Sequence, residues 1–213
     1  MRALFNSALA FLVVLALARS AFAADASSLK PPPGAKVAIV MFEDLECPDC
    51  ARAYPVVWEA ANAHHIPVVL HDFPLPKHNW SFKAAVFARF FDTKSQKLGN
   101  DYRGFIYQNQ NLISDEAGLQ YYTKKFADEN KVLLPFAVDP DGSLTTKVRV
   151  DYDLGQKIGL EHTPTIFVIG QGTASTPFVE VVNRDQLSQI IEDMQKKAGP
   201  AAPARSAAKK KAQ

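Results

Sequence analysis

Only two cysteines occur in the 213-residue sequence, and they stand three positions apart as Cys47-Pro48-Asp49-Cys50. An apolar run over 37–42 precedes them, and a stretch with apolar residues at helical spacing follows. A strand that leads Cys47 into the N-terminus of a helix places its sulfur against unpaired backbone N–H groups and the positive end of the helix dipole. This position favours the thiolate, which is the reactive form in disulfide exchange. The pattern therefore predicts a redox-active pair.

Two other interpretations of the pair are a structural disulfide and half of a zinc site. A disulfide that closes so short a loop adds little stability. A zinc ion needs two further ligands, and sulfur-rich zinc sites usually contain paired cysteine clusters, which this sequence lacks. The candidate ligands are scattered along the chain: His64, His65, His71, His78 and His162. We therefore predict no metal ion and no cofactor other than a redox-active Cys47–Cys50 disulfide.

The N-terminus has the composition of an export signal. Met1-Arg2 is followed by an apolar stretch over 8–18, and Ala21-Phe22-Ala23 then forms a small-x-small end. We predict a signal peptide over 1–23, cleaved after Ala23, and hence a periplasmic or secreted protein. The apolar stretch is short for a bilayer span, and an uncleaved anchor is the alternative.

The mature chain over 24–213 carries no net charge. Arg2 and Arg19 leave with the signal peptide, and the remaining 22 basic residues equal the 22 acidic ones. Because no positive excess is left, we predict no nucleic-acid partner. The length is sufficient for one domain with a sizeable core, so folding does not need a disulfide.

Both ends of the mature chain differ in composition from its middle. Residues 24–34 include three consecutive prolines and predict an extended lead-in, because proline favours the polyproline conformation. Residues 199–213 are low in complexity and contain a lysine run, which predicts a disordered basic tail. Such a tail can contact anionic lipid or cell wall, although a merely solvated tail is the more usual case.

The first part of the folded body has the pattern of a βαβ unit, within 35–76. A continuous apolar run over 36–42 predicts a buried strand, helical spacing predicts a helix over 48–65, and a second apolar run predicts a strand over 67–73. The right-handed crossover rule then makes the two strands parallel neighbours in one sheet.

The rest of the folded body changes character twice. Helical patterns fill 77–159 and predict a helical insertion of four helices. Within 160–198, two apolar runs over 165–169 and 178–182 predict a hairpin, and Asn183 is a candidate cap for a final helix. The expected order is therefore βαβ, helical insertion, ββα.

This order resembles the DsbA-like branch of the thioredoxin superfamily, and the resemblance covers roughly 34–198. Residues 42–50 fit the pattern aromatic-x-acid-x-x-Cys-Pro-x-Cys. Pro55 lies eight residues after Cys47, where the thioredoxin helix is kinked, and Thr163-Pro164 resembles the Thr-cis-Pro loop. The resemblance implies an α/β thioredoxin fold with a helical insertion, and a cis peptide bond before Pro164.

The resemblance also implies roles for four residues. Cys47 resembles the exposed nucleophile that forms the mixed disulfide with a substrate, and Cys50 resembles the more buried, resolving partner. Thr163 and Pro164 would approach the active disulfide. The backbone of Thr163 would pair with an extended segment of the substrate. Such backbone pairing depends more on the shape of the segment than on its sequence.

Two departures from the family pattern change what surrounds the cysteines. Where many relatives keep a buried acid six residues before the first cysteine, this chain has Met41. Glu43 or Asp44 could approach from the strand end and serve Cys50, although acids there are more often solvated or capping. His162 replaces the usual small residue before Thr-Pro; it could add positive charge near the sulfurs, or be an ordinary surface or core histidine.

Residues close to the cysteines are expected to modulate the redox poise. Pro48 and Asp49 lie between the two sulfurs, and the acids near them are Glu43, Asp44, Glu46 and Asp49. Their negative charge opposes the thiolate that the helix terminus favours. We therefore expect a Cys47 pKa above that of the strongest oxidases of the family, and a less oxidising potential.

These features together predict an exported thiol:disulfide oxidoreductase that exchanges disulfides with cysteine-containing proteins through Cys47 and Cys50. A further redox partner must reset the active site after each turnover. One alternative is a redox-inactive thioredoxin-like binding domain, and another is a copper-handling protein that uses the two soft thiolates. We expect the chain to be a monomer.

Overall fold

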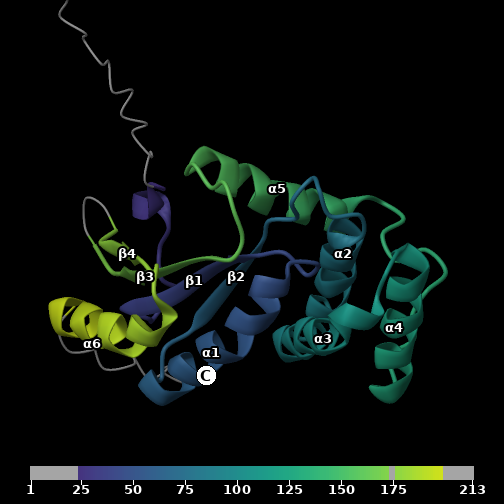
Figure 1. Cartoon of the computed structure of the whole chain (residues 1–213), viewed down its shortest axis with the longest axis horizontal. Helices are drawn as coiled ribbons and strands as arrows, with labels where there is room; N and C mark the ends of the chain where they lie inside the picture. The colour runs from purple at the N-terminus through teal and green to yellow at the C-terminus, as the bar shows by residue number, and fades with distance from the viewer. Residues whose placement is uncertain (1–23, 173–175, 199–213) are drawn as a thin grey trace, which may run out of the picture.

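The computed structural model describes residues 24–172 and 176–198 and has a mixed α/β fold (Figure 1). In this part of the chain a four-stranded sheet has the order β2-β1-β3-β4. The strands are β1 (Val37–Glu43), β2 (Val68–Asp72), β3 (Thr165–Gly170) and β4 (Phe178–Glu180). β1 and β2 are parallel and β3 and β4 antiparallel, which confirms the predicted crossover and hairpin. β3 also pairs antiparallel with β1 and so joins both units into one sheet.

The side chains of β1 enter two cores on opposite faces of the sheet, because strand residues point alternately up and down. Val37, Ile39 and Met41 lie in a core with residues of α1 (Pro48–His64) and α6 (Leu187–Ala198). Ala38, Val40 and Phe42 lie in a second core, against which side chains of α5 (Ser143–Lys157) pack. Figure 1 shows α1 and α6 below the sheet and α5 above it. All seven residues of β1 are buried, so the strand that leads to Cys47 is held from both sides.

The predicted extended lead-in is partly wrong. Residues Ala26–Ser28 form a short 3-10 helix, and Ala24, Ala26 and Leu29 are buried in the second core. The backbone N–H of Asp25 donates to the carbonyl of Ile158 at 2.9 Å. The physical reason is that these apolar side chains pack with residues of β1 and β3, and burying them favours a packed segment over a free one.

The four helices expected within 77–159 are present. They are α2 (Ser81–Asp92), α3 (Gln96–Asn109), α4 (Glu116–Glu129) and α5 (Ser143–Lys157). In Figure 1, α2, α3 and α4 lie together beyond one end of the sheet, whereas α5 returns over its face. Phe91, Tyr102 and Phe126 form an aromatic cluster among α2, α3 and α4, with ring centroids 4.6 to 5.3 Å apart. This cluster is continuous with the core on the α1 face of the sheet, so the insertion and the sheet share one packed interior.

The C-terminal unit begins its helix later than predicted. Asn183 caps a 3-10 turn over Arg184–Gln186, its side chain accepting from the N–H of Asp185, and α6 starts only at Leu187. Thus the predicted cap is a cap, but of this 3-10 turn and not of the α-helix. The turn carries Arg184 toward the start of α1, as described below.

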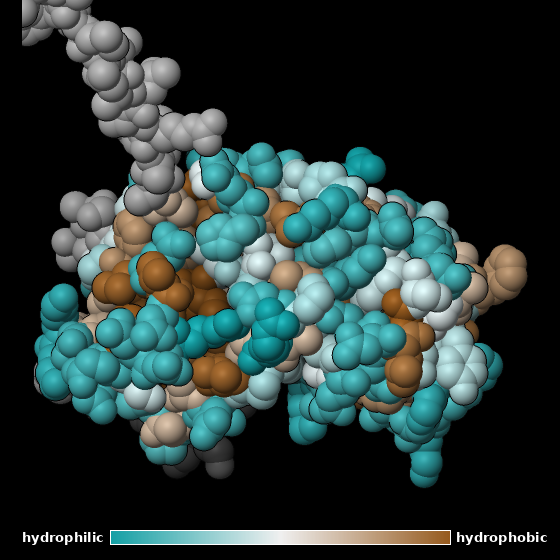
Figure 2. Space-filling view, viewed as in Figure 1, coloured by the Kyte–Doolittle hydropathy of each residue, from teal (hydrophilic) through white to brown (hydrophobic). Residues whose placement is uncertain are grey.

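Polar residues cover much of the face shown in Figure 2, and an apolar area lies at the end that holds β3, β4 and α6. Within residues 24–172 and 176–198, none of the helices has both the length and the apolar character that crossing a bilayer requires. The predicted signal peptide over 1–23 and the predicted basic tail over 199–213 lie outside the described residues.

Candidate active site

Cys47 is the N-cap of α1, with Pro48 and Asp49 in the first helical turn. The pKa of Cys47 is lowered to about 5, and the largest cause is a hydrogen bond from the Cys50 thiol. Burial opposes this shift, whereas the backbone N–H groups of Cys50 and Asp49 add to it. These N–H groups belong to the first turn of the helix, where they have no partner within the helix itself. The start of α1 therefore stabilises a thiolate on Cys47.

Cys50 has the opposite environment. Its side chain is fully buried, and burial raises its pKa well above the ordinary value. A negative charge on Cys47 raises it further, while the N–H of Asp44, 3.4 Å from the Cys50 sulfur, lowers it. Both cysteines are free thiols in this structure. The pair is thus asymmetric, with one thiol easily ionised and the other held protonated.

Cys47 is less accessible than the sequence predicts, since only 7% of it is exposed. The reason is the loop before β3, where the peptide bond between Thr163 and Pro164 is cis, as the family resemblance implies. The Cys47 thiol donates to the Thr163 carbonyl at 3.3 Å. Phe42 pairs with Thr165, and this register brings the loop from the other half of the chain against the start of α1.

The Thr163 hydroxyl is a second feature of this loop. Its oxygen is buried and has no hydrogen-bond partner among the described residues. Because a hydroxyl hydrogen rotates, this group can donate to the Cys47 sulfur once the thiol is ionised, and the Thr163 side chain contributes to the low pKa of Cys47. The Thr163 carbonyl therefore accepts a hydrogen bond from the Cys47 thiol, and the Thr163 hydroxyl can donate one to the thiolate.

Gln110 also reaches the active site, and sequence reasoning missed it. Its side-chain amide, at the end of α3, donates to the carbonyls of Leu45 at 2.8 Å and Cys47 at 3.2 Å. Gln110 is 7% exposed and ties the loop before α1 to the helical insertion. A lone glutamine at the end of a predicted helix carries no sequence signal for this contact.

Three other predicted modulators near Cys47 lie closer to the surface. Pro48 and His162 are exposed, while Asp49 is half-buried and pairs with Arg184 at 2.8 Å and Arg52 at 3.1 Å. Asp49, His162 and Pro164 help to line a groove of about 280 Å³ beside the cis-proline loop. Two arginines therefore offset the negative charge of Asp49. Burial raises the pKa of this carboxyl, but the two arginines lower it by more, so the net shift is downward.

Glu43 and Asp44 are buried, against the expectation that acids at the strand end are solvated. They are 1% and 2% exposed. Asp44 accepts from the N–H groups of Glu46 and Leu75 and pairs with His78 at 2.6 Å. These contacts bind the loop after β1 to the segment after β2. Burial is stable here because each carboxylate has several partners.

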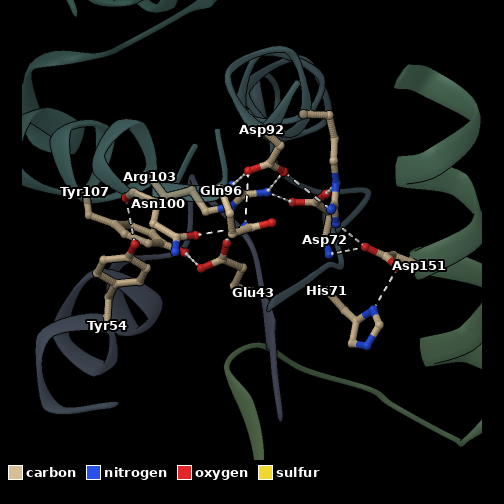
Figure 3. A network of polar contacts seen from close by, with 11 residues as sticks. Glu43, Tyr54, His71, Asp72, Asp92, Gln96, Asn100, Arg103, Tyr107 and Asp151 are labelled. Atoms are coloured by element: carbon tan, nitrogen blue, oxygen red, sulfur yellow. Dashed lines mark hydrogen bonds and ion pairs between the residues drawn. The ribbon is translucent and has the colours of Figure 1, made fainter. Parts of the chain in front are cut away.

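Glu43 belongs to a network of buried charges that joins the sheet to the helical insertion (Figure 3). The guanidinium of Arg103, on α3, lies 2.9 Å from Glu43 and 2.9 Å from Asp92, and the Tyr107 hydroxyl donates to Glu43 at 2.9 Å. Arg89, on α2, pairs with Asp72 and Asp151. His71, on β2, lies 2.7 Å from Asp151. Four carboxyl groups thus face two guanidinium groups in this network.

Burial is the main cause of the raised pKa of Glu43, and the neighbouring charges act in both directions. Burial raises its pKa to about 7, while Arg103 lowers it and Asp72 raises it. One proton on Glu43 reduces the excess negative charge of the network. Sequence reasoning could not find this network because its members come from five elements separated along the chain.

We expect the stability of a Glu43→Gln variant to depend less on pH than that of the wild type. The folded pKa of Glu43, about 7, lies above the ordinary value of 4.5, so the folded state binds this proton more tightly. This carboxyl therefore stabilises the fold at low pH and loses that contribution as pH rises through 4.5 toward 7. We compare the free energy of unfolding, measured with urea, at about pH 4 and about pH 8. Between these pH values the stability of the variant relative to wild type should rise by about 2–3 kcal/mol. A stability difference that is constant with pH would contradict this.

Among the described residues, no three or more histidine, cysteine, aspartate or glutamate side chains are grouped so that they could hold a metal ion. The groups that the fold brings together at this site are the two thiols, the cis-proline loop and the buried carboxyl of Glu43.

A cysteine pair at the start of a helix, beside a cis-proline that opens a central strand, defines a thioredoxin-like fold and site. The family model described as Thioredoxin matches residues 32–199, and the chain belongs to this family. A comparison with curated proteins found no match.

Solved structures of thiol-disulfide exchange proteins share this fold, in agreement with the predicted fold class. The thiol-disulfide exchange protein alpha-DsbA2 from Wolbachia pipientis is 19% identical, with a TM-score of 0.59 over 78% of this chain and 86% of that chain. The catalytic domain of Proteus mirabilis ScsC is 20% identical, with a TM-score of 0.60 over 77% and 86%. A periplasmic thioredoxin-like protein from Salmonella enterica serovar Typhimurium is 17% identical, with a TM-score of 0.59 over 78% and 87%. At these identities the likeness concerns the fold.

Proposed function

We propose that this protein is an exported thiol:disulfide oxidoreductase that exchanges disulfides with cysteine-containing proteins. The observation that supports this most directly is the asymmetry of the pair: the Cys47 pKa is lowered to about 5, while the fully buried Cys50 has its pKa raised. A thiolate present at neutral pH is a good attacking and leaving group. The second thiol stays protonated until it attacks the mixed disulfide.

In the reducing direction the Cys47 thiolate attacks one sulfur of a substrate disulfide. The substrate S–S bond breaks, one substrate thiolate leaves, and a mixed disulfide forms. Cys50 then loses its proton and attacks the Cys47 sulfur, which releases the second substrate thiolate. The substrate gains two electrons, and the chain becomes the Cys47–Cys50 disulfide. The oxidising direction is the reverse of these steps, and a redox partner of the opposite kind restores the starting state.

The proton of Cys50 needs an acceptor, and we assign it to Glu43. The charge of Glu43 raises the pKa of Cys50, so the two groups interact through the buried interior. A carboxyl with a pKa of about 7 can take up and return a proton near neutral pH. Glu43 lies two positions after Met41 and therefore on the same face of β1. This supports Glu43 in the role that the buried acid at the position of Met41 has in many relatives. The Glu43→Gln variant should therefore also resolve mixed disulfides more slowly than wild type.

The groove beside Pro164 supports an extended polypeptide as the substrate. It lies next to the Thr163 carbonyl that contacts Cys47, and its exposed rim includes His162. A substrate segment that pairs with the backbone of this loop would present its disulfide to Cys47 without requiring a particular sequence.

The function is tested by the reduction of insulin with dithiothreitol, followed by turbidity. We expect the wild-type protein to accelerate precipitation, since an exchanging dithiol transfers electrons faster than the reagent alone. A Cys47→Ser, Cys50→Ser double variant is the matched control. A folded wild-type protein that gives no acceleration over this control would favour the redox-inactive binding domain and overturn the proposal.

Export is supported by the composition of residues 1–23 and by the fold shared with a periplasmic protein. We expect the chain isolated from the producing cell to begin at Ala24. Intact-mass measurement tests this, and a chain that retains Met1 in a membrane fraction would favour an uncleaved anchor.

A further inference from the structure

Arg184 connects the C-terminal unit of the fold to the residues between the cysteines. One terminal nitrogen of its guanidinium donates to the Asp49 carboxylate at 2.8 Å, and the other donates to the Asp49 backbone carbonyl at 3.3 Å. The two residues are 135 positions apart in the chain. The fork of the arginine therefore holds both the side chain and the main chain of Asp49.

The segment that carries Arg184 is fixed on both sides. The N–H of Val181 donates to the Ile166 carbonyl at 2.8 Å, which extends the β3–β4 pairing. Leu187 is 1% exposed and anchors the start of α6 in the core. Asn183 caps the 3-10 turn between these anchors. The backbone that carries Arg184 is thus held in place on both sides. The planar fork of the guanidinium is pre-organised, so little side-chain freedom is lost for each hydrogen bond.

Asp49 acts on Cys47 in two opposite ways. Its backbone N–H donates to the Cys47 sulfur and favours the thiolate. Its carboxylate, in the same helical turn, places a negative charge near that sulfur and disfavours the thiolate. Holding the main chain of Asp49 in place strengthens the hydrogen bond from its N–H to Cys47. Pairing its carboxylate with a cation weakens the repulsion between the carboxylate and the thiolate. The contacts of Arg184 do both.

Arg52 provides a natural comparison. It also pairs with Asp49, at 3.1 Å, but only through the carboxylate and from a side chain that is 67% exposed. Arg184 is 32% exposed and makes the additional backbone contact. The other charged or titratable side chains on the groove are His162 and Glu180. Of the two arginines that contact Asp49, Arg184 is the one that also hydrogen-bonds to its main chain.

We propose that Arg184 is a positioning residue that holds Asp49 against the start of α1 and so keeps Cys47 in its reactive, ionised form. This inference rests on the proposed function and adds to it a residue that sets the redox poise from outside the Cys-Pro-Asp-Cys motif. A more stable thiolate stabilises the reduced protein and makes its disulfide a stronger oxidant.

The test measures the Cys47 pKa by thiolate absorbance against pH, and the reduction potential by equilibration with glutathione. Because the pair with Asp49 is partly exposed, we expect Arg184→Gln to raise the pKa by about half a unit. This corresponds to a potential about 15 mV more reducing for the two-electron couple. Arg52→Gln removes the same charge and should cause a clearly smaller shift.

Arg184→Lys separates positioning from charge alone. Lysine keeps the positive charge but cannot make the forked contact, so we expect most of the pKa shift to persist in this variant. A lysine variant with the wild-type pKa and potential would overturn the proposal in favour of charge alone. An unchanged pKa in Arg184→Gln, or an equal shift in Arg52→Gln, would overturn it as well.

Thermal unfolding of each variant separates these outcomes from damage to the fold, because a merely structural role would move the melting temperature without moving the Cys47 pKa. The pKa and potential are measured on the protein itself and need no substrate. If wild type accelerates insulin reduction but the Arg184 variants keep its pKa, this inference fails and the proposed function stands. If wild type gives no acceleration, the proposed function fails.

Discussion

Cys47→Ser is expected to abolish disulfide exchange, whereas Cys50→Ser is expected to trap mixed disulfides through Cys47. Cys47 carries the lowered pKa of about 5 and contacts the cis-proline loop, so it performs the first attack. Without Cys50, that attack still occurs, but no second thiol releases the substrate. Incubation with an oxidised substrate protein, followed by mass measurement under non-reducing conditions, should show the covalent adduct only in Cys50→Ser.

The environment of Cys50 explains why the roles should not be exchangeable. Cys50 is fully buried, and burial raises the pKa of its thiol, so on its own it is both hidden and protonated. The double variant with both serines is the control for non-covalent association. Equal trapping by the two single variants would show that either cysteine can start the reaction, and the assignment of roles would then be wrong.

Arg103→Leu is expected to lower the free energy of unfolding by about 3–5 kcal/mol, because removal of one partner leaves buried carboxylates uncompensated. Arg103 is fully buried and pairs with Glu43 and Asp92, each at 2.9 Å. Leucine also cannot bridge α3 to the end of β1. Urea unfolding should show this loss, with a fall of about 10 °C or more in the melting temperature.

Lys97→Leu is the matched control, since Lys97 forms an ion pair with Asp101 on the same helix but is 83% exposed. Exposed pairs of this kind contribute little, so its unfolding curve should stay close to that of wild type. If Arg103→Leu were as stable as Lys97→Leu, the buried network would not hold the insertion to the sheet. A loss confined to pH values above about 7 would instead point to the charge on Glu43 alone.

The sequence determined the features that depend on neighbours along the chain. The strand before Cys47, the helix after it and the crossover to β2 follow from apolar periodicity and from the limited ways of connecting parallel strands. The position of Cys47 at the helix N-terminus follows from the same local pattern. The cis bond before Pro164 came from the family resemblance, because residue types alone favour the trans form.

Tertiary structure decided which charges act on the sulfurs. Acids near the cysteines were expected to oppose the thiolate, yet Asp49 is paired by Arg184, 135 residues away in the chain, and Glu43 is buried against Arg103 and Tyr107. A carboxyl group at a strand end is usually solvated, and no local pattern marks the exception. Burial and ion pairing depend on side chains brought together by the whole fold, so a sequence lists the charges but leaves their partners to the packing of distant elements.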